Sequence, residues 1–224
     1  MNTMEAEFLA GKDAVRQHFN KFTRKAFEML PKLDKPQILD VGCGSGVPTM
    51  ELARMSDGQI TALDVDQTSI DRLSRKIEEA GLSGRIKAVK CSMFDMDFPG
   101  ESFDIIWAEG SIAVMGFERG LKGWSKFLKP GGFLAVHDEK GDIGEKLDQI
   151  SNCGYDLLGY FKLDEQTWRK EYYAPLRKLV DQTRTQCADD PSALALLDKE
   201  RQELEFFNKD PARCCSVFFI MRKR

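Results

Sequence analysis

Residues 36 to 140 alternate short apolar runs with amphipathic segments, and no other feature restricts the possible folds as much. The apolar runs predict strands over 37–41, 59–65, 86–90, 103–109 and 132–138. The amphipathic segments predict helices over 46–55, 67–80 and 120–128. Regular alternation of this kind builds a parallel sheet with right-handed crossovers and helices on both faces. We therefore expect a Rossmann-like α/β fold.

The segments on either side of this core have different sequence patterns. Residues 5–30 carry an apolar stripe at helical spacing and end at Pro31. Residues 164–207 are mostly helical, with breaks near Pro175 and at Asp190-Pro191, and a last strand is expected over 214–221. We expect one domain over residues 1–224, in which a helical cap over 1–34 and a helical insertion over 164–209 flank the core at 36–140.

Composition excludes several classes of protein. The 224 residues carry a formal net charge of −3, whereas a nucleic-acid binder usually has a basic excess. The sequence has no apolar run of membrane-spanning length and no secretory signal at its start, so we predict a cytoplasmic protein without a membrane span. The six cysteines form no Cys-x-x-Cys pair, which argues against a zinc site.

A glycine loop follows the first strand, where Gly42, Gly44 and Gly46 alternate with other residues just before a helix. Glycines at such a turn let a ligand approach the backbone, at the sheet edge where α/β proteins bind ligands. The loop lacks the Lys-Ser/Thr pair of a triphosphate-binding P-loop. Its Gly-x-Gly-x-Gly spacing also departs from the Gly-x-Gly-x-x-Gly pattern of dinucleotide-binding proteins.

Two acidic residues indicate which ligand the loop accepts. Asp40 stands two residues before Gly42, where its charge would repel a diphosphate and attract an ammonium or a sulfonium. Asp64 ends the second strand, where an acid can bind both hydroxyls of a ribose. A ligand with a cationic amino acid part and a ribose, but no phosphate, matches both acids. S-adenosylmethionine has these parts.

The sequence resembles the class I S-adenosylmethionine-dependent methyltransferases of the small-molecule type. The resemblance rests on four motifs in order, at 38–46, 60–66, 102–109 and 128–137. It implies a seven-stranded sheet with one antiparallel strand, at 214–221. It further implies that S-adenosylmethionine is the cofactor, and that the residues binding it are Asp40, Gly42, Cys43, Gly44, Gly46, Asp64, Val65, Ser92, Met93 and Glu109. Many relatives have Asp where Ser92 stands, so the adenine contact departs from the family pattern.

Methyl transfer requires alignment of the acceptor, and a base only if the acceptor loses a proton. Glu109 and His137 end the fourth and fifth strands, and we hypothesise that one of them orients the acceptor or takes its proton. We predict no metal. A metal-assisted reaction at Glu109, Asp138 and Glu139 stays open as an alternative.

The leading hypothesis is therefore methyl transfer to a small-molecule acceptor. A nucleic-acid or protein methyltransferase is an alternative, although residues 109–112 lack the Asn/Asp-Pro-Pro-aromatic motif of base-amine methyltransferases. A non-catalytic protein that only binds the cofactor is a third possibility. An NAD-dependent oxidoreductase is disfavoured by the glycine spacing and by Asp40. The sequence does not identify the acceptor atom or the oligomeric state.

Overall fold

The computed structural model describes residues 3–187 and 191–224, which divide into two compact units. One unit is helical and joins the chain up to Asn20 with Leu163–Cys215. The other holds the sheet and joins Lys21–Lys162 with Ser216–Arg224. The arrangement of cap, core and insertion within one domain stays a prediction.

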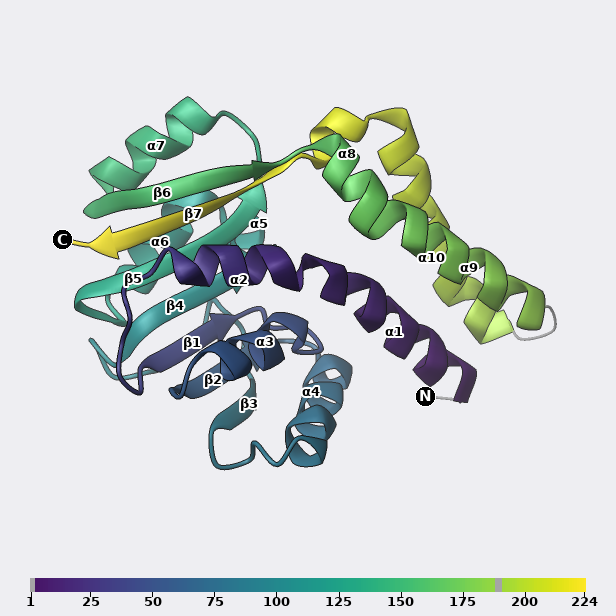
Figure 1. The fold of residues 1–224 in the computed structure, drawn as a ribbon, viewed down its shortest axis with the longest axis horizontal. Coiled ribbons are helices and arrows are strands. Elements are labelled where there is room, and N and C mark those ends of the chain that lie inside the picture. Colours follow the sequence, from purple (N-terminus) through teal and green to yellow (C-terminus); the bar gives the residue numbers. More distant parts are fainter. Residues whose placement is uncertain (1–2, 188–190) are drawn as a thin grey trace. The chain divides into compact units, whose positions relative to one another are not determined.

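The second unit is built on a seven-stranded sheet in the order β3-β2-β1-β4-β5-β7-β6 (Figure 1). Its strands are β1 (Gln37–Val41), β2 (Gln59–Asp64), β3 (Ile86–Lys90), β4 (Phe103–Glu109), β5 (Leu128–Glu139), β6 (Tyr155–Leu163) and β7 (Ser216–Lys223). The pairs from β3 to β5 are parallel, and β7 runs antiparallel to β5. The predicted Rossmann-like fold, mostly parallel with an antiparallel last strand, is confirmed.

Helices cover both faces of this sheet (Figure 1). They are α2 (Asn20–Glu28), α3 (Val47–Met55), α4 (Gln67–Glu79), α5 (Ile112–Met115), α6 (Phe117–Ser125) and α7 (Ile143–Asn152). On one face, Leu121 and Trp124 of α6 join a buried apolar cluster with Phe219 of β7. On the other face, the ring of Phe27 in α2 lies 6.1 Å from that of Trp107 in β4. The sheet is therefore buried on both sides, as expected for parallel strands.

The helical unit is assembled from segments far apart in the sequence. Its helices are α1 (Thr3–Arg16), a 3-10 turn (Gln17–Phe19), α8 (Glu165–Trp168), a π-helical turn (Arg169–Tyr173), α9 (Ala174–Gln186), α10 (Pro191–Lys209) and a second 3-10 turn (Pro211–Cys214). Lys12 of α1 forms an ion pair of 2.7 Å with Glu200 of α10. Tyr172 and Tyr173 are buried, and the Tyr173 ring stacks on Phe207 at 3.9 Å. These aromatic residues form the core of the unit.

Several predicted boundaries need correction. The helix expected over 5–30 is interrupted at 17–19, so that α1 and α2 belong mainly to different units. Strand β5 starts at Leu128 rather than at 132, because Leu128 pairs with Phe103 before the register shifts. Strand β7 starts at Ser216, since Cys214 ends a 3-10 turn. Of the expected break at Asp190-Pro191, Asp190 lies outside the described residues and Pro191 begins α10.

Among the helices of the described residues, none combines the length and the apolar character that crossing a membrane requires.

Candidate active site

The glycine loop folds back over the end of β2. The backbone amides of Gly42 and Cys43 both donate hydrogen bonds to the carbonyl of Leu63, at 2.8 and 2.9 Å. The amide of Gly46 closes the turn onto the Cys43 carbonyl at 2.9 Å. The loop is therefore fixed to the neighbouring strand at the carboxyl edge of the sheet, where α/β proteins bind ligands.

The three glycines of the loop have different surroundings. A Cβ atom at Gly42 would lie 2.4 Å from the Cβ of Ser111, and one at Gly46 would lie 2.2 Å from Cδ1 of Leu73. These two glycines are needed for packing within the protein. A Cβ at Gly44 would meet no atom within 4 Å, and Gly44 has a φ of +53°. Gly44 thus exposes open backbone to a ligand.

Asp64 is held beside Gly44 by two backbone amides. One carboxylate oxygen accepts from the Gly44 amide at 2.8 Å, and the other accepts from the Asp66 amide at 2.9 Å. Asp66 in turn accepts a hydrogen bond from the amide of Ser69 and caps α4. The side chain of Asp64 is only half-buried. Its carboxylate is therefore oriented without being enclosed, which suits an acceptor for ribose hydroxyls.

Asp40 is the buried acid of the site. Its side chain is 1% exposed and accepts a hydrogen bond of 2.6 Å from the hydroxyl of Thr49 in α3. Burial, opposed by the hydrogen bond from Thr49 and assisted by the charges of Glu109 and Asp64, raises the pKa of Asp40 to about 7. A cation bound nearby would favour the ionised form of Asp40. The residue thus fits a ligand with an ammonium or sulfonium group.

Replacement of Asp40 by Asn should change how stability depends on pH. An unfolded aspartate titrates near 3.8 and the folded one near 7, so the folded protein binds the extra proton between these values. Its stability therefore falls as the pH rises from about 4 to about 7. Asp40→Asn should raise the free energy of unfolding at pH 8 by on the order of 3 kcal/mol, with less effect towards pH 4.

Urea unfolding at several pH values measures this effect. Asp66→Asn is the control, because the hydrogen bonds from Ser69 hold the pKa of Asp66 below its ordinary value. Asp66→Asn should lower the free energy of unfolding, and this loss should become smaller as the pH falls. An Asp40→Asn variant with the same pH profile as the parent protein would show that Asp40 is not a buried acid of raised pKa.

The residues expected near an adenine lie after β2 and β3. Val65 is 67% exposed. Met93 lies close to the glycine loop, because its methyl group would be 3.8 Å from a Cβ atom placed at Gly42. The hydroxyl of Ser92 accepts from the amide of Phe94 at 3.2 Å, which orders this turn. Phe94 is 50% exposed, and the Arg119 guanidinium lies 5.5 Å from its ring. Phe94 was not predicted, although an aromatic residue directly after the expected adenine contacts was a signal for it.

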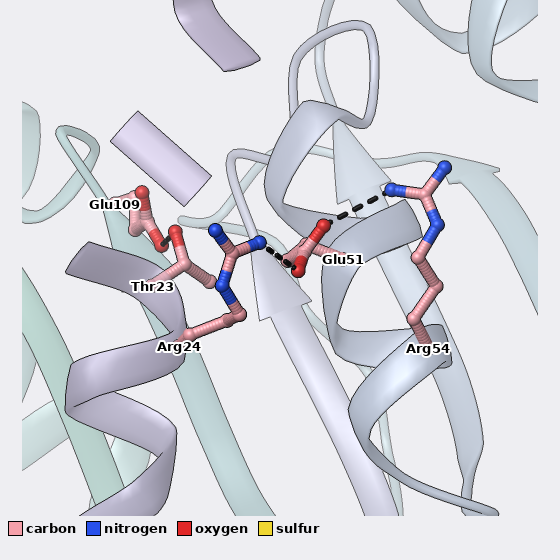
Figure 2. Close-up of polar contacts among 5 residues, drawn as sticks. All are labelled: Thr23, Arg24, Glu51, Arg54 and Glu109. Carbon is pink, nitrogen blue, oxygen red and sulfur yellow. Dashed lines mark hydrogen bonds and ion pairs between the residues drawn. The ribbon is translucent and has the colours of Figure 1, made fainter. Parts of the chain in front are cut away.

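Glu109 ends β4 and is tied to the helix above it. One of its carboxylate oxygens accepts hydrogen bonds from the Trp107 indole at 2.9 Å and from the Thr23 hydroxyl at 2.8 Å. Thr23 lies on α2 and is 1% exposed (Figure 2). Glu109 is thereby fixed at the carboxyl edge of the sheet. Thr23 could not be predicted from the sequence, because 86 positions separate it from its partner.

A second contact ties α2 to α3. Arg24 and Arg54 bind the two carboxylate oxygens of Glu51 at 2.6 and 3.0 Å (Figure 2). Burial by itself would raise the pKa of Glu51, but the bonds and charges of the two arginines outweigh it and hold the pKa below its ordinary value. Because α3 begins at the glycine loop, the Arg24–Glu51 pair connects the position of α2 to that loop. These three residues were also missed by the sequence analysis.

His137 lies opposite Glu109 in the register of β4 and β5. It is 3% exposed, its Nε2 is 2.7 Å from the hydroxyl of Ser216, and its ring stacks on Phe218 at 4.2 Å. The structure therefore brings the two predicted catalytic residues side by side on the same sheet, but it buries the imidazole beside Phe218 and Ser216. Their catalytic roles stay predictions.

The neighbouring acid of β5 has a separate partner. Asp138 is 4% exposed and forms an ion pair of 2.6 Å with Lys146 of α7. Glu139, the next residue, is exposed. In the part of the chain that the structure describes, no three His, Cys, Asp or Glu side chains gather as a metal-binding group would.

A cavity of about 1080 Å³ lies away from the glycine loop, at the amino ends of the strands. It is lined by Pro36 before β1, by Ser56 and Asp57 before β2, and by residues of α2 that include Phe27 and Glu28. No residue expected to bind the cofactor lines it. The chemistry of the glycine loop, rather than cavity size, places the candidate site at the carboxyl edge.

A seven-stranded sheet with an antiparallel β7, and a glycine loop after β1, are the features that the resemblance to the class I S-adenosylmethionine-dependent methyltransferases implied. Residues 38–132 match the family described as a methyltransferase domain. This match and the fold support the resemblance seen in the sequence to the class I S-adenosylmethionine-dependent methyltransferases. S-adenosylmethionine is the cofactor of the class, and the open Gly44, the half-buried Asp64 and the buried Asp40 fit it.

Individual proteins are similar to this chain in sequence or in fold. The chain is 38% identical to sterol 24-C-methyltransferase erg-4 of Neurospora crassa over 169 residues, which are 62% of this chain and 45% of the relative. The fold matches the [4+2]-cyclase SpnF with a TM-score of 0.77 at 22% identity, over 91% of this chain and 80% of SpnF. It also matches a Geobacter sulfurreducens S-adenosylmethionine-dependent methyltransferase in complex with S-adenosylhomocysteine, with a TM-score of 0.75 at 17% identity over 90% of each chain. The chain spans about half the length of the curated relatives it matches first.

Proposed function

We propose that this protein transfers a methyl group from S-adenosylmethionine to a small-molecule acceptor. The observation that carries the proposal is the pairing of Asp64 with Gly44, in which an oriented, half-buried carboxylate stands beside open backbone. Asp64 would bind the ribose and Asp40 would favour the cationic amino acid part. Val65 and Phe94 offer exposed apolar surface for the adenine.

The remaining residues of the glycine loop have supporting roles in this proposal. Gly42 and Cys43 fix the loop to β2 through their backbone amides. Gly46 has no side chain and so leaves room for the side chain of Leu73 to pack against the loop. Ser92 orders the turn that carries Met93 towards the loop. These residues would shape the cofactor site mainly through their backbone.

Glu109 would position the acceptor. When bound, the cofactor supplies an electrophilic methyl group on a positively charged sulfur, so an acceptor aligned with that group needs little else. The bonds from Thr23 and Trp107 hold the Glu109 carboxylate in one orientation, from which it can accept a hydrogen bond or a proton from the acceptor. His137 is 3% exposed, and its ring contacts Ser216 and Phe218, so Glu109 is the stronger candidate.

The relatives and the charge support a small-molecule acceptor. A sterol methyltransferase is among the similar proteins, and a net charge of −3 does not favour a nucleic-acid substrate. Apolar small molecules, sterols included, are therefore the acceptors to test first. Transfer to RNA or protein, and binding without transfer, are the alternatives.

Two measurements test this function. Calorimetry should show binding of S-adenosylhomocysteine and no binding of NAD, and the reverse result would contradict the cofactor assignment. Transfer of labelled methyl from S-adenosylmethionine should then be measured with sterols, other apolar small molecules, RNA and protein. Label found only in RNA or protein, or in none of the acceptors, would contradict the proposed substrate class.

The role of Glu109 has its own test in the same assay. Glu109→Gln should lower kcat for the methylated small molecule by about 100-fold, within the usual range for loss of a general base or orienting group. Glu118→Gln is the matched control, because Glu118 is exposed on α6 and forms an ion pair with Lys122 of the same helix. Equal kcat values for the two variants would remove Glu109 from the mechanism.

A further inference from the structure

The two edges of the sheet differ in how they are protected. Strand β3 forms one edge, has only five residues and carries Lys87 and Lys90. Short strands and lysines are common protection against pairing with another chain. Strand β6 forms the opposite edge and has nine residues (Figure 1). Its exposed apolar side chains include Leu157, Leu158 and Tyr160, which are 37%, 43% and 40% exposed.

Strand β6 is firmly held by its own sheet. The ring of Phe161 stacks on Phe218 of β7 at 5.0 Å, and the ring of Tyr160 stacks on Phe219 at 5.9 Å. A Cβ at Gly159 would lie 2.5 Å from the methyl group of Met29, so this glycine lets α2 pack against the strand. The exposed apolar side chains therefore belong to an ordered strand, and such an edge is a ready template for another strand.

The sequence of β6 complements itself when two copies run antiparallel. Pairing centred on Gly159 brings Asp156 of one copy opposite Lys162 of the other, and the reverse. The same pairing places Leu158 opposite Tyr160. Opposite charges and apolar pairs directly across two strands stabilise a sheet. The charges and apolar residues thus fit a second copy of this strand.

We propose that two copies of this chain pair through β6 and form a symmetric dimer with one continuous sheet. The pairing is isologous, so each stabilising side-chain pair occurs twice. Within one copy, Asp156 also lies 3.8 Å from Arg224. The dimer is independent of the methyl-transfer activity.

Charge reversal and charge exchange test the interface. Sedimentation equilibrium from about 1 to about 100 μM should show association of the parent protein, since an interface of modest area is concentration-dependent. Asp156→Lys should raise the dissociation constant at least about tenfold, because it places lysines opposite each other twice. The double variant Asp156→Lys with Lys162→Asp should restore the dimer. Restored association would not depend on the contact with Arg224, because the double variant lacks the Asp156 carboxylate that makes this contact.

Two further variants complete the test. Leu158→Lys should abolish the dimer, and circular dichroism should show that the monomer is folded. Glu79→Lys makes the same charge change as Asp156→Lys on the exposed end of α4 and should leave the dimer unchanged. A parent protein that stays monomeric throughout the range would overturn the proposal. So would a dimer that survives Leu158→Lys, or a charge exchange that fails to restore association.

Discussion

Replacing Asp64 with Ala should weaken binding of S-adenosylhomocysteine by at least about 100-fold, because hydrogen bonds from two ribose hydroxyls to a charged acceptor would be lost. The variant would also release the amides of Gly44 and Asp66 that the carboxylate now binds. Isothermal calorimetry measures the change in affinity directly.

Asp66→Ala is the matched control for this loss. It removes an acid only two positions away, together with the cap of α4, and should lower the free energy of unfolding by about 1 kcal/mol. Its affinity for S-adenosylhomocysteine should stay close to that of the parent protein. If Asp66→Ala weakened binding as much as Asp64→Ala, the ribose would not be recognised by Asp64.

Replacing Gly44 with Ala should weaken binding of the same ligand by about 10- to 100-fold, because the new methyl group would occupy space that the ligand needs. No protein atom lies within 4 Å of that position, so the methyl group itself clashes with nothing in the free protein. An alanine in the left-handed backbone conformation of Gly44 should lower the free energy of unfolding by about 1–2 kcal/mol.

Gly81 provides the control for this backbone strain. It has a φ of +66°, and a Cβ there would also meet no atom within 4 Å, but it follows α4 outside the candidate site. Gly81→Ala should therefore lose similar stability and keep full affinity. Thermal unfolding and calorimetry on both variants separate the two effects. Equal affinities would show that no ligand approaches Gly44.

The sequence predicted the parts of the fold that depend on local pattern. The alternation of apolar and amphipathic segments led to the sheet and its crossovers, and the glycine spacing led to the loop. The start of α4 at residue 67 was also predicted, since a helix start is encoded within a few residues. Adjacent residues carry each of these signals.

Contacts between distant segments were not predicted. Apolar spacing continues through 17–19, so it gave no sign of the 3-10 turn that separates α1 from α2. Lys12 and Glu200, 188 positions apart, join two segments that the sequence treated as separate. The bonds from Thr23 to Glu109 and from Arg24 to Glu51 are likewise tertiary. Local sequence patterns do not indicate such tertiary contacts.

The account depends most on where an adenosyl ligand binds. A crystal structure with S-adenosylhomocysteine tests this directly. We predict that the ribose hydroxyls lie about 3 Å from the carboxylate of Asp64 and that the adenosyl group passes over Gly44. A nucleoside bound instead in the cavity beside Pro36 and Ser56, at the amino ends of the strands, would contradict the account.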